Sequence, residues 1–305
     1  MVEKVFDGAS PYFQKEGQPV MLPSLVCFVD ILGFSKQTTE AFKKGTAEVF
    51  LSRIRKALTS AYKSLRRDDE LFRLLSSSPS YAVKVFTDNA VLGYPIPGFG
   101  SEEFKLADIL QIFSEYQLCL ASEGFLVRGG IAFGDLYMDE DIVFGEALIE
   151  AVKLDRKGGS PRICLAKSAI EFARKHIKEW TEINELLHDA DGSVFLNYLD
   201  HSLFAFPDAF SPELIKNHRT TVINGLKEYI NEPEIKAKFE WAARYHNFFC
   251  SETVSRSPIP TSECADPEWG AACVEIEKLN ELLIDLENYA SQPSRLKKLD
   301  GDYTS

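Results

Sequence analysis

The stretch LVCFVDILGFS at residues 25–35 decides the fold class of this chain. Its first eight residues are apolar except for Asp30, and such a run is typical of a strand buried on both faces of a sheet. Gly33 ends the run, and Ser35 can cap a helix that begins at about Lys36. The stretch therefore predicts a central strand, a turn and a helix, with one acid inside the strand.

The hydrophobic pattern on the C-terminal side predicts further elements. Apolar stripes indicate helices, and short apolar runs between turn residues indicate strands. We expect helices at residues 46–66, 101–122, 145–154, 167–177, 212–230, 234–250 and 270–290. We expect strands at residues 81–87, 90–94, 125–133, 136–144, 162–165, 194–198 and 202–206. Residues 67–80 are charged and then rich in Ser and Pro, which favours a surface loop.

Helices alternate with antiparallel hairpins up to about residue 207, and the pattern beyond is helical only. This order predicts an α+β fold in which helices cover a mixed sheet, with a C-terminal helical extension. We expect three regions: an N-terminal arm over residues 1–23, a core over residues 24–207, and a helical extension over residues 208–305 that packs on the core.

The composition limits the partners of the chain. Among its 305 residues, Asp and Glu (46) outnumber Lys and Arg (34), so the formal net charge is −12. Such a surface repels nucleic-acid backbones and anionic lipid, so we expect no nucleic acid and no membrane as partner. The six cysteines form no Cys-x-x-Cys pair, and the N-terminus lacks the apolar stretch of a secretory signal. We therefore expect a cytoplasmic protein with free thiols.

Two acidic residues stand at positions where a carboxylate charge needs a compensating partner. Asp30 interrupts the buried strand, and Asp88 lies at the tip of the next hairpin. If the strands are neighbours, both carboxylates emerge at one sheet edge and form an oxygen-rich site suited to Mg²⁺ or Mn²⁺. The helix start beside them offers backbone N–H groups to a phosphate. On spacing alone the alternative stays open that Asp30 caps a helix and Asp88 serves a turn.

Four segments, in this order, resemble parts of the class III nucleotidyl cyclases. The first metal-binding strand of that family is similar to residues 28–35 (FVDILGFS), and its second metal hairpin to residues 84–88 (KVFTD). Its next strand is similar to residues 127–134 (VRGGIAFG), and the helix with the transition-state residues to residues 145–154 (GEALIEAVKL). The resemblance is colinear over about half the chain and implies the ferredoxin-like mixed sheet of that family.

More narrowly, the chain resembles the pyrimidine cyclases of bacterial Pycsar antiphage defence systems. The similarity lies in the RGGI strand, the FGEAL helix start and the segment from Lys238 to Asn247. It implies a uridylate or cytidylate cyclase whose product activates a separate effector upon phage infection. From the residues alone, Trp241 and Tyr245 in that segment form the buried aromatic stripe of a helix.

The family resemblance implies a metal site. Asp30 and Asp88, with the carbonyl of Ile31, would bind two divalent cations, Mn²⁺ or Mg²⁺. One cation would activate the ribose 3′-hydroxyl for attack on the α-phosphate, and the other would hold the triphosphate. The amides of Gly33 and Phe34 would contact phosphate oxygens.

The resemblance also implies two cationic residues. Lys84 stands at the place of the base-contacting lysine, and Lys153 at the place of the arginine that stabilises the pentavalent phosphate. The alternative for both is a solvated surface lysine. Class III cyclases build each site from two chains, so the resemblance implies a homodimer with composite sites, in which Asp30 and Asp88 face the lysines of the partner.

The chain departs from the family at the base and ribose side of the site. Ile149 replaces the asparagine that orients the ribose, Ile142 replaces an aspartate that reads the base, and Thr87 replaces a glycine before the second metal aspartate. A lysine without its aspartate partner suits a carbonyl oxygen better than an amine. Phe86 and Phe144 would narrow the pocket if they face it. These features favour UTP over CTP, and either over ATP.

Three functions remain open at this stage. The first is conversion of UTP to cyclic UMP, with CTP as the alternative substrate. The second is a catalytically inactive homologue that acts as a nucleotide sensor, which Ile149 and Lys153 favour and the Asp30/Asp88 pair opposes. The third is a metal-dependent phosphodiesterase or nuclease, which the scattered histidines disfavour.

Overall fold

The apolar run around Asp30 forms strand β1 (Leu22–Ile31), which lies in the middle of the sheet. It pairs in antiparallel fashion with β3 (Asn89–Pro95) on one side and with β4 (Val127–Met138) on the other. Side chains on both faces of β1 are buried, as the continuous apolar run predicts. The computed structural model describes residues 10–12, 18–75, 81–96, 102–156, 159–176, 185–203, 212–256, 276–286 and 296–298.

Within these residues the sheet has nine strands in the order β2-β3-β1-β4-β6-β8-β7-β9, with β5 paired to β4 outside this path. The remaining strands are β2 (Ala82–Phe86), β5 (Val143–Gly145), β6 (Ile163–Leu165), β7 (Leu186–His188), β8 (Val194–Leu196) and β9 (Lys297–Lys298). Strand β6 runs parallel to β4, whereas the other pairs are antiparallel. The predicted α+β class with a mixed sheet is confirmed.

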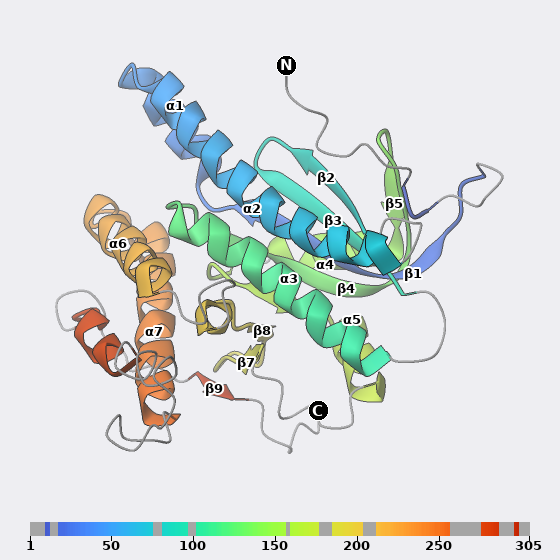
Figure 1. Cartoon of the computed structure of the whole chain (residues 1–305). Helices are drawn as coiled ribbons and strands as arrows, with labels where there is room; N and C mark the ends of the chain where they lie inside the picture. The colour runs from blue at the N-terminus through green and yellow to red at the C-terminus, as the bar shows by residue number, and fades with distance from the viewer. Residues whose placement is uncertain are drawn as a thin grey trace.

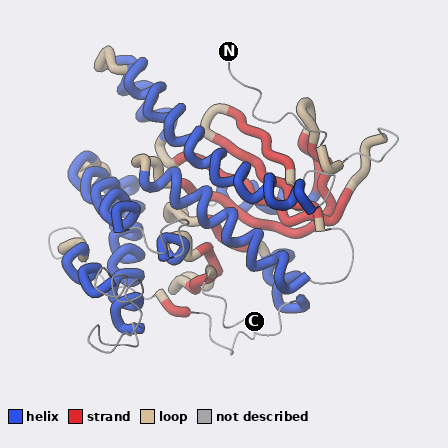
Figure 2. The backbone as a smooth tube through the Cα atoms, viewed as in Figure 1, coloured by secondary structure: helices blue, strands red, loops and turns tan. Residues whose placement is uncertain are grey.

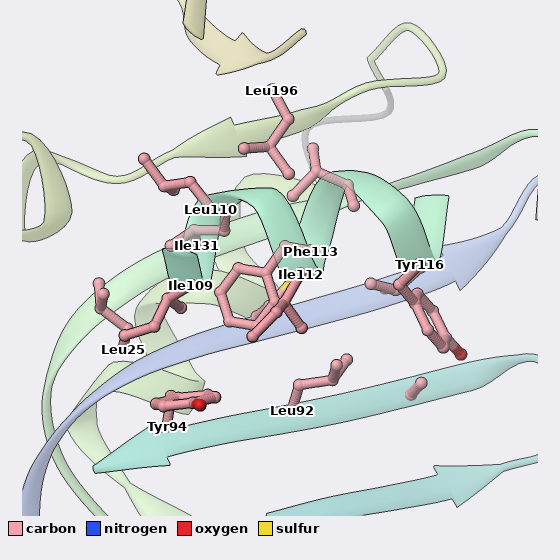
Figure 3. Packing of buried hydrophobic residues seen from close by; sticks show 14 of the residues in the cluster. Leu25, Leu92, Tyr94, Ile109, Leu110, Ile112, Phe113, Tyr116, Ile131 and Leu196 are labelled. Atoms are coloured by element: carbon pink, nitrogen blue, oxygen red, sulfur yellow. The ribbon is translucent and has the colours of Figure 1, made fainter. Parts of the chain in front are cut away.

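The helices lie on both sides of the sheet (Figures 1 and 2). They are α1 (Phe34–Lys43), α2 (Ala47–Leu75), α3 (Glu102–Ser122), α4 (Glu146–Arg156), α5 (Lys167–His176), α6 (Pro212–Glu228) and α7 (Pro233–Arg256), with the 3₁₀ helices η2 (Asp200–Leu203) and η4 (Lys278–Leu282). Helices α2, α3 and α5 share a buried apolar cluster with one face of the sheet. Figure 3 shows Phe113 and Tyr116 of α3 above Leu25 of β1 and Leu92 of β3.

Helix α4 packs on the opposite face of the sheet. Ala147 and Ala151 of this helix share a buried cluster with Val26 and Ala132. The approach is close at Gly130, where an added Cβ would lie 2.5 Å from the carbonyl oxygen of Ala151. A side chain at this position of β4 would push α4 off the sheet.

Helices α6 and α7 form a third apolar cluster with the far end of the sheet. It contains Phe195 of β8 and Trp241 and Tyr245 of α7, whose rings stack or meet edge to face. The predicted aromatic stripe of this helix is therefore buried. Leu32, the residue that follows β1, also belongs to this cluster. The end of the central strand thus lies against the C-terminal helices.

Several predicted boundaries in the first half of the core are wrong. Helix α2 continues to Leu75 instead of ending at Arg66, because its sequence contains no Gly or Pro that would stop it. Residues 76–80 of the predicted loop lie outside the described residues. Helix α1 begins at Phe34 with Gly33 as its N-cap, so Ser35 lies in the first turn and is not the cap.

The predicted hairpin around residues 134 and 135 is also wrong. Strand β4 runs through Gly134 without a break, and the chain turns at residues 139–142. The carboxylate of Asp139 forms this turn by accepting the N–H groups of Asp141 (2.8 Å) and Ile142 (2.6 Å). Gly134 lies within the strand, and an added Cβ there would lie 3.6 Å from Ala147 of α4, an ordinary contact distance.

The second half of the chain differs from the prediction in its short elements. Strand β8 pairs with β7, and residues 200–203 form a 3₁₀ helix instead of a strand. Residues 204–206 lie outside the described residues. Of the helix expected at residues 270–290, residues 276–282 are helical and residues 283–286 are not. No helix among the described residues has the length and apolar composition to cross a lipid bilayer.

Candidate metal and phosphate site

The turn after β1 presents the start of α1. Gly33 has a φ of +72° and a ψ of 16°, a left-handed conformation that glycine adopts without strain. No side chain of the described residues caps the helix, so the N–H groups of its first turn point out of the helix end. Phe34 anchors the turn by packing against Phe50, with ring centroids 6.1 Å apart. The turn therefore offers backbone donors to an anion at a fixed place.

The structure places Asp30 and Asp88 at the same end of neighbouring strands. Asp30 is paired across the sheet with Asn89, the residue after Asp88. The N–H of Ile31 donates to the carbonyl of Asp88 at 3.0 Å, which ties the hairpin tip to the end of β1. The charge of the Asp88 carboxylate contributes to a raised pKa of Asp30. The two acids, remote in sequence, are therefore electrostatic neighbours.

The hairpin tip holds Asp88 in a defined position. Its carboxylate oxygen Oδ1 accepts hydrogen bonds from the hydroxyl of Thr87 (2.6 Å) and from the amide of Asn89 (3.2 Å). Thr87 has a φ of +51°. This left-handed conformation favours glycine over residues that carry a side chain. Thr87 therefore keeps the backbone shape of the turn at a cost in strain and adds a hydroxyl that binds the acid.

Arg128 of β4 lies between Asp30 and a third acid, Asp155 of α4. Its Nε donates to Asp30 Oδ2 at 3.0 Å and lies 2.9 Å from Asp155 Oδ1. The side chains of Asp30 and Asp155 are only 14% and 10% exposed. Burial raises the pKa of Asp30 most, and the charges of Asp155 and then Asp88 raise it further, against the lowering effect of Arg128. One arginine thus compensates the cluster only in part.

Helix α7 contributes a second cation to this cluster. The half-buried Lys238 has a lowered pKa because of burial and the charge of Arg128, and the charges of Asp155 and Asp30 oppose this lowering. Lys238 therefore lies within the electric field of the Asp30 cluster. Helix α7 therefore acts on the candidate site through the charge of this side chain.

The residues present fit a pair of hard divalent cations. Asp30, Asp88 and Asp155 carry three negative charges against the two positive charges of Arg128 and Lys238, so the cluster has negative charge in excess. Carboxylate and carbonyl oxygens are the ligands that Mg²⁺ and Mn²⁺ prefer, and substrate phosphates usually complete their coordination. The described residues contain no group of three or more His, Cys, Asp or Glu side chains arranged to hold a metal by themselves. The donor set therefore suits cations that enter with a phosphate ligand.

The two candidate lysines do not meet these carboxylates within one chain. Lys84 donates from Nζ to the backbone carbonyl of Glu140 at 2.7 Å, so it contacts the turn between β4 and β5. Lys153 is exposed on α4. The structure thus brings together Asp30, Ile31, Asp88 and the Gly33 turn, and it leaves both lysines apart from them.

The sequence analysis missed Arg128, Asp155 and Lys238. Arg128 stands inside an apolar strand at residues 127–134, where a lone charge signals a buried partner. Asp155 follows Lys153 by two residues at the end of α4, and no spacing rule pairs it with Arg128. A search for charges inside buried patterns would have found Arg128 but not its partners.

Comparison with known proteins gives the following result. No protein-family model matches the chain. No curated protein sequence matches it. Among solved structures, the crystal structure of the adenylyl cyclase CyaB from P. aeruginosa is similar with a TM-score of 0.40 and 11% identity, over 58% of this chain and 93% of that chain. That of a class III adenylyl cyclase-like ATP-binding protein from Pseudomonas aeruginosa is similar with a TM-score of 0.35 and 11% identity, over 50% of this chain and 35% of that chain.

Proposed function

We propose that this protein is a metal-dependent nucleotide cyclase that converts UTP to 3′,5′-cyclic UMP and pyrophosphate. The observation that carries the proposal is the meeting of Asp30 and Asp88 at one sheet edge, through the bond from Ile31 N–H to the Asp88 carbonyl. The uncapped start of α1 at Gly33 follows directly, so carboxylates and phosphate donors stand side by side. A nucleoside triphosphate with its cations needs both.

The roles of the chain's own residues follow from this arrangement. Asp30, Asp88 and the Ile31 carbonyl would hold two divalent cations, Mn²⁺ or Mg²⁺, which when bound supply Lewis-acid activation of the 3′-hydroxyl and charge neutralisation of the pyrophosphate. The amides of Gly33 and Phe34 would bind phosphate oxygens and fix the triphosphate against β1. Burial of Asp30 by β4 and α4 excludes water from its inner side and strengthens these electrostatic contacts.

The site would be completed by a second copy of the chain. Lys84 and Lys153 do not reach the carboxylates of their own chain, and apolar side chains on β2, β5 and α4 are exposed to solvent. Phe86 of β2 is 49% exposed, Phe144 of β5 is 66% exposed, and Ile149, one turn before Lys153, is 57% exposed. A homodimer would cover such side chains and bring the partner's lysines to the base and the reacting phosphate.

The substrate class is inferred from what the site lacks. Ile149 carries no amide for the ribose, and Ile142 carries no carboxylate for an exocyclic amine. A lysine next to aromatic side chains suits the carbonyl oxygens of uracil, and Nζ of Lys84 lies 5.4 Å from the centroid of the Phe86 ring. CTP is the alternative substrate. The resemblance to the antiphage pyrimidine cyclases supports a role as a cytoplasmic second-messenger synthase whose product is read by a separate effector.

The second candidate function is a nucleotide sensor without turnover. The observation that favours it is the exposed Ile149 at a position where the resemblance implies a ribose-binding asparagine. The charge excess of the acid cluster favours the enzyme, because a protein that binds no cation gains nothing from placing the largely buried carboxylates of Asp30 and Asp155 against one arginine, with Asp88 nearby.

The deciding experiment incubates the purified protein with Mn²⁺ and each of the four ribonucleoside triphosphates and detects cyclic products by mass. We expect cyclic UMP from UTP, and its loss in Asp30→Asn and Asp88→Asn. Glu213→Gln, which neutralises an exposed acid on α6, is the control and should leave the yield unchanged. Nucleotide binding without turnover of any triphosphate would favour the sensor.

Mixing two inactive variants tests the composite site. Asp88→Asn and Lys153→Ala would each lack activity as homodimers, whereas a mixed dimer has one site free of both changes. After subunit exchange at equal concentrations, half of the dimers are mixed, so about a quarter of the wild-type activity should return. Activity that stays at the level of the single variants would contradict sharing of the site between chains.

A further inference from the structure

The guanidinium of Arg128 occupies the inner side of the candidate metal site. Its Nε lies 3.0 Å from Asp30 Oδ2 and 2.9 Å from Asp155 Oδ1, and its side chain is 24% exposed. The contact with Asp30 is a charge-assisted hydrogen bond, and the contact with Asp155 is an ion pair without hydrogen-bond geometry. Arg128 is thus equally close to two carboxylates, one of which belongs to the candidate metal ligands and the other does not.

This contact joins the two elements that carry the proposed chemistry. Asp30 ends β1, whereas Asp155 lies in the last turn of α4, the helix that carries Lys153. Arg128 lies on β4, which pairs with β1 and is covered by α4 at Gly130. Lys238 of α7 is the other basic group in the field of this cluster. A change in the charge of the Asp30 carboxylate therefore affects Asp155 of α4 through the guanidinium of Arg128.

We infer that Asp155 is a positioning residue that holds Arg128 off Asp30 when a divalent cation binds there. The inference rests on the proposed function, because it concerns the same metal site. Without the cation, Arg128 forms ion pairs with both acids and compensates their charge in part. With the cation, the guanidinium and the cation compete for the Asp30 carboxylate, and Asp155 provides the second acceptor onto which Arg128 moves.

The alternative arrangement shows why the second acceptor matters. If residue 155 were neutral, Asp30 would be the stronger, charged partner of Arg128, and a cation would have to displace the guanidinium from that partner. Removing a partner of a buried charge is costly, so the cation would bind more weakly. Residues that orient metal ligands in this indirect way typically change metal affinity by about 10- to 100-fold when substituted.

The test measures binding of Mn²⁺ alone, by electron paramagnetic resonance of the free ion and by calorimetry, without nucleotide. We expect Asp155→Asn to raise the Kd for Mn²⁺ about 10-fold. Asp155→Glu, which keeps the carboxylate, should restore most of the affinity. Glu150→Gln is the matched control, because Glu150 lies on the same helix but accepts a hydrogen bond from Ser168 (2.5 Å) instead of Arg128. It should leave the Kd unchanged.

Arg128→Met separates positioning from a general loss of negative charge. This variant removes the competitor, so its Kd for Mn²⁺ should be equal to or lower than that of the wild type. In its background, Asp155→Asn should raise the Kd by much less than in the wild type, because Asp155 acts through Arg128. An equal loss in both backgrounds, or no loss in either, overturns the inference.

Two further results distinguish failure of the proposed metal site from failure of the inference about Asp155. Mn²⁺ binding that is unchanged in Asp30→Asn would overturn the proposed metal site, and the inference with it. Mn²⁺ binding that depends on Asp30 but is unaffected by Asp155→Asn would overturn the inference alone. If Asp155→Asn does not fold, as judged by circular dichroism, Arg128→Met decides, because a Kd above that of the wild type contradicts competition.

Discussion

The end of β1 and the interface between α6 and α7 both bury titratable side chains, but they satisfy them in different ways. At the end of β1, three carboxylates share two basic groups, and negative charge remains in excess. Between α6 and α7, His218 and His246 are fully buried with their rings stacked, 5.3 Å apart between centroids. The first cluster has negative charge that a further cation could compensate, whereas in the second cluster every ring nitrogen already has a hydrogen-bond partner.

A chain of hydrogen bonds satisfies the histidine pair, and each bond in it donates in the same direction along the chain. The carbonyl of Leu282 can only accept, so Nε2 of His246 donates to it at 3.0 Å. The Nδ1 atom of His246 must then accept from Nδ1 of His218 at 3.1 Å. The Nε2 atom of His218 in turn accepts from the hydroxyl of Tyr198 at 2.8 Å. Both rings are neutral, and every ring nitrogen has a partner.

The histidine pair stabilises the fold, whereas the acid cluster at the end of β1 is suited to metal binding. Burial lowers the pKa of His218 well below its ordinary value and that of His246 to about 4, so neither ring titrates near neutral pH. A closed network of this kind fixes the packing of α6 against α7 and η4. At the end of β1, burial and neighbouring acids raise the pKa of Asp30 instead. Excess charge there disfavours the folded state, and binding of the proposed cations would relieve this cost.

The largest expected effect is the loss of activity in Asp30→Asn without loss of stability. The amide keeps an acceptor for Arg128 but removes a charge that lies among other acids, so the melting temperature should stay equal or rise. Cyclase activity should fall by about 100-fold or more, because the cations lose a ligand. Mass detection of product and thermal unfolding measure the two quantities. A parallel loss of both would make the cluster a structural one.

The next largest effect is a loss of stability without a loss of activity, in His246→Leu. This change leaves the Leu282 carbonyl and the His218 Nδ1 without their present partners inside the C-terminal cluster. The free energy of unfolding should fall by about 2–4 kcal/mol, and the melting temperature by about 5–10 °C. Activity per folded molecule at 20 °C should remain. Unchanged stability would show that the pair contributes nothing to the fold.

The two clusters should also respond oppositely to acid. The pKa values of both histidines are lowered in the folded state, so their stabilising contribution is complete above the ordinary histidine pKa and is lost as the pH falls. From pH 7.5 to 6.0 the free energy of unfolding should decrease by about 1–2 kcal/mol. Unfolding at a series of pH values measures this slope, which His246→Leu should flatten.

The contribution of Asp30 to the free energy of unfolding depends on pH in the opposite direction. Its pKa is raised on folding, so its unfavourable contribution is present at neutral pH and is relieved as the pH falls toward the ordinary aspartate value. Acid-induced unfolding should therefore be steeper in Asp30→Asn than in the wild type. The same slope in both proteins would contradict the excess of charge at the end of β1.

The smallest effect concerns the two left-handed residues beside the site. Gly33→Ala should lower the free energy of unfolding by about 1 kcal/mol, because a side chain is strained at a φ of +72° although it would find space there, 3.7 Å from Gln37. Thr87→Gly removes strain of the same kind but also a hydrogen bond to Asp88, so its stability should change by less. Urea titrations of both variants would show whether the turn or the hairpin tip carries more strain.

The elements that position the site were predictable because their patterns are local. The apolar run of β1, the turn residues of the β2–β3 hairpin and the stripe of α4 each lie within a dozen residues. The neighbouring position of Asp30 and Asp88 then follows from pairing β1 with β3. Strand β8 lies within the strand predicted at residues 194–198, whereas its partner β7 was not predicted, because its three residues are too few to show a period of two.

The contacts between distant elements were not predictable in this way. The approach of Asp155 to Arg128 depends on how α4 crosses the sheet, which Gly130 and the small residues Ala147 and Ala151 decide together. Lys238 reaches the cluster only because α7 packs against the far end of the same sheet. Charge compensation of this kind is a property of tertiary packing, and one strand or helix alone does not contain it.

Three consecutive residues at the end of β1 belong to three different surroundings. Ile31 is buried beneath α2 and α3, Leu32 is buried in the cluster of the C-terminal helices, and Gly33 faces solvent. A polypeptide shortened to end before α6 would remove a large part of the apolar cluster that contains Leu32, one residue from the left-handed glycine. We therefore expect a fragment without α6 and α7 to hold the β1–α1 connection less firmly than the whole chain.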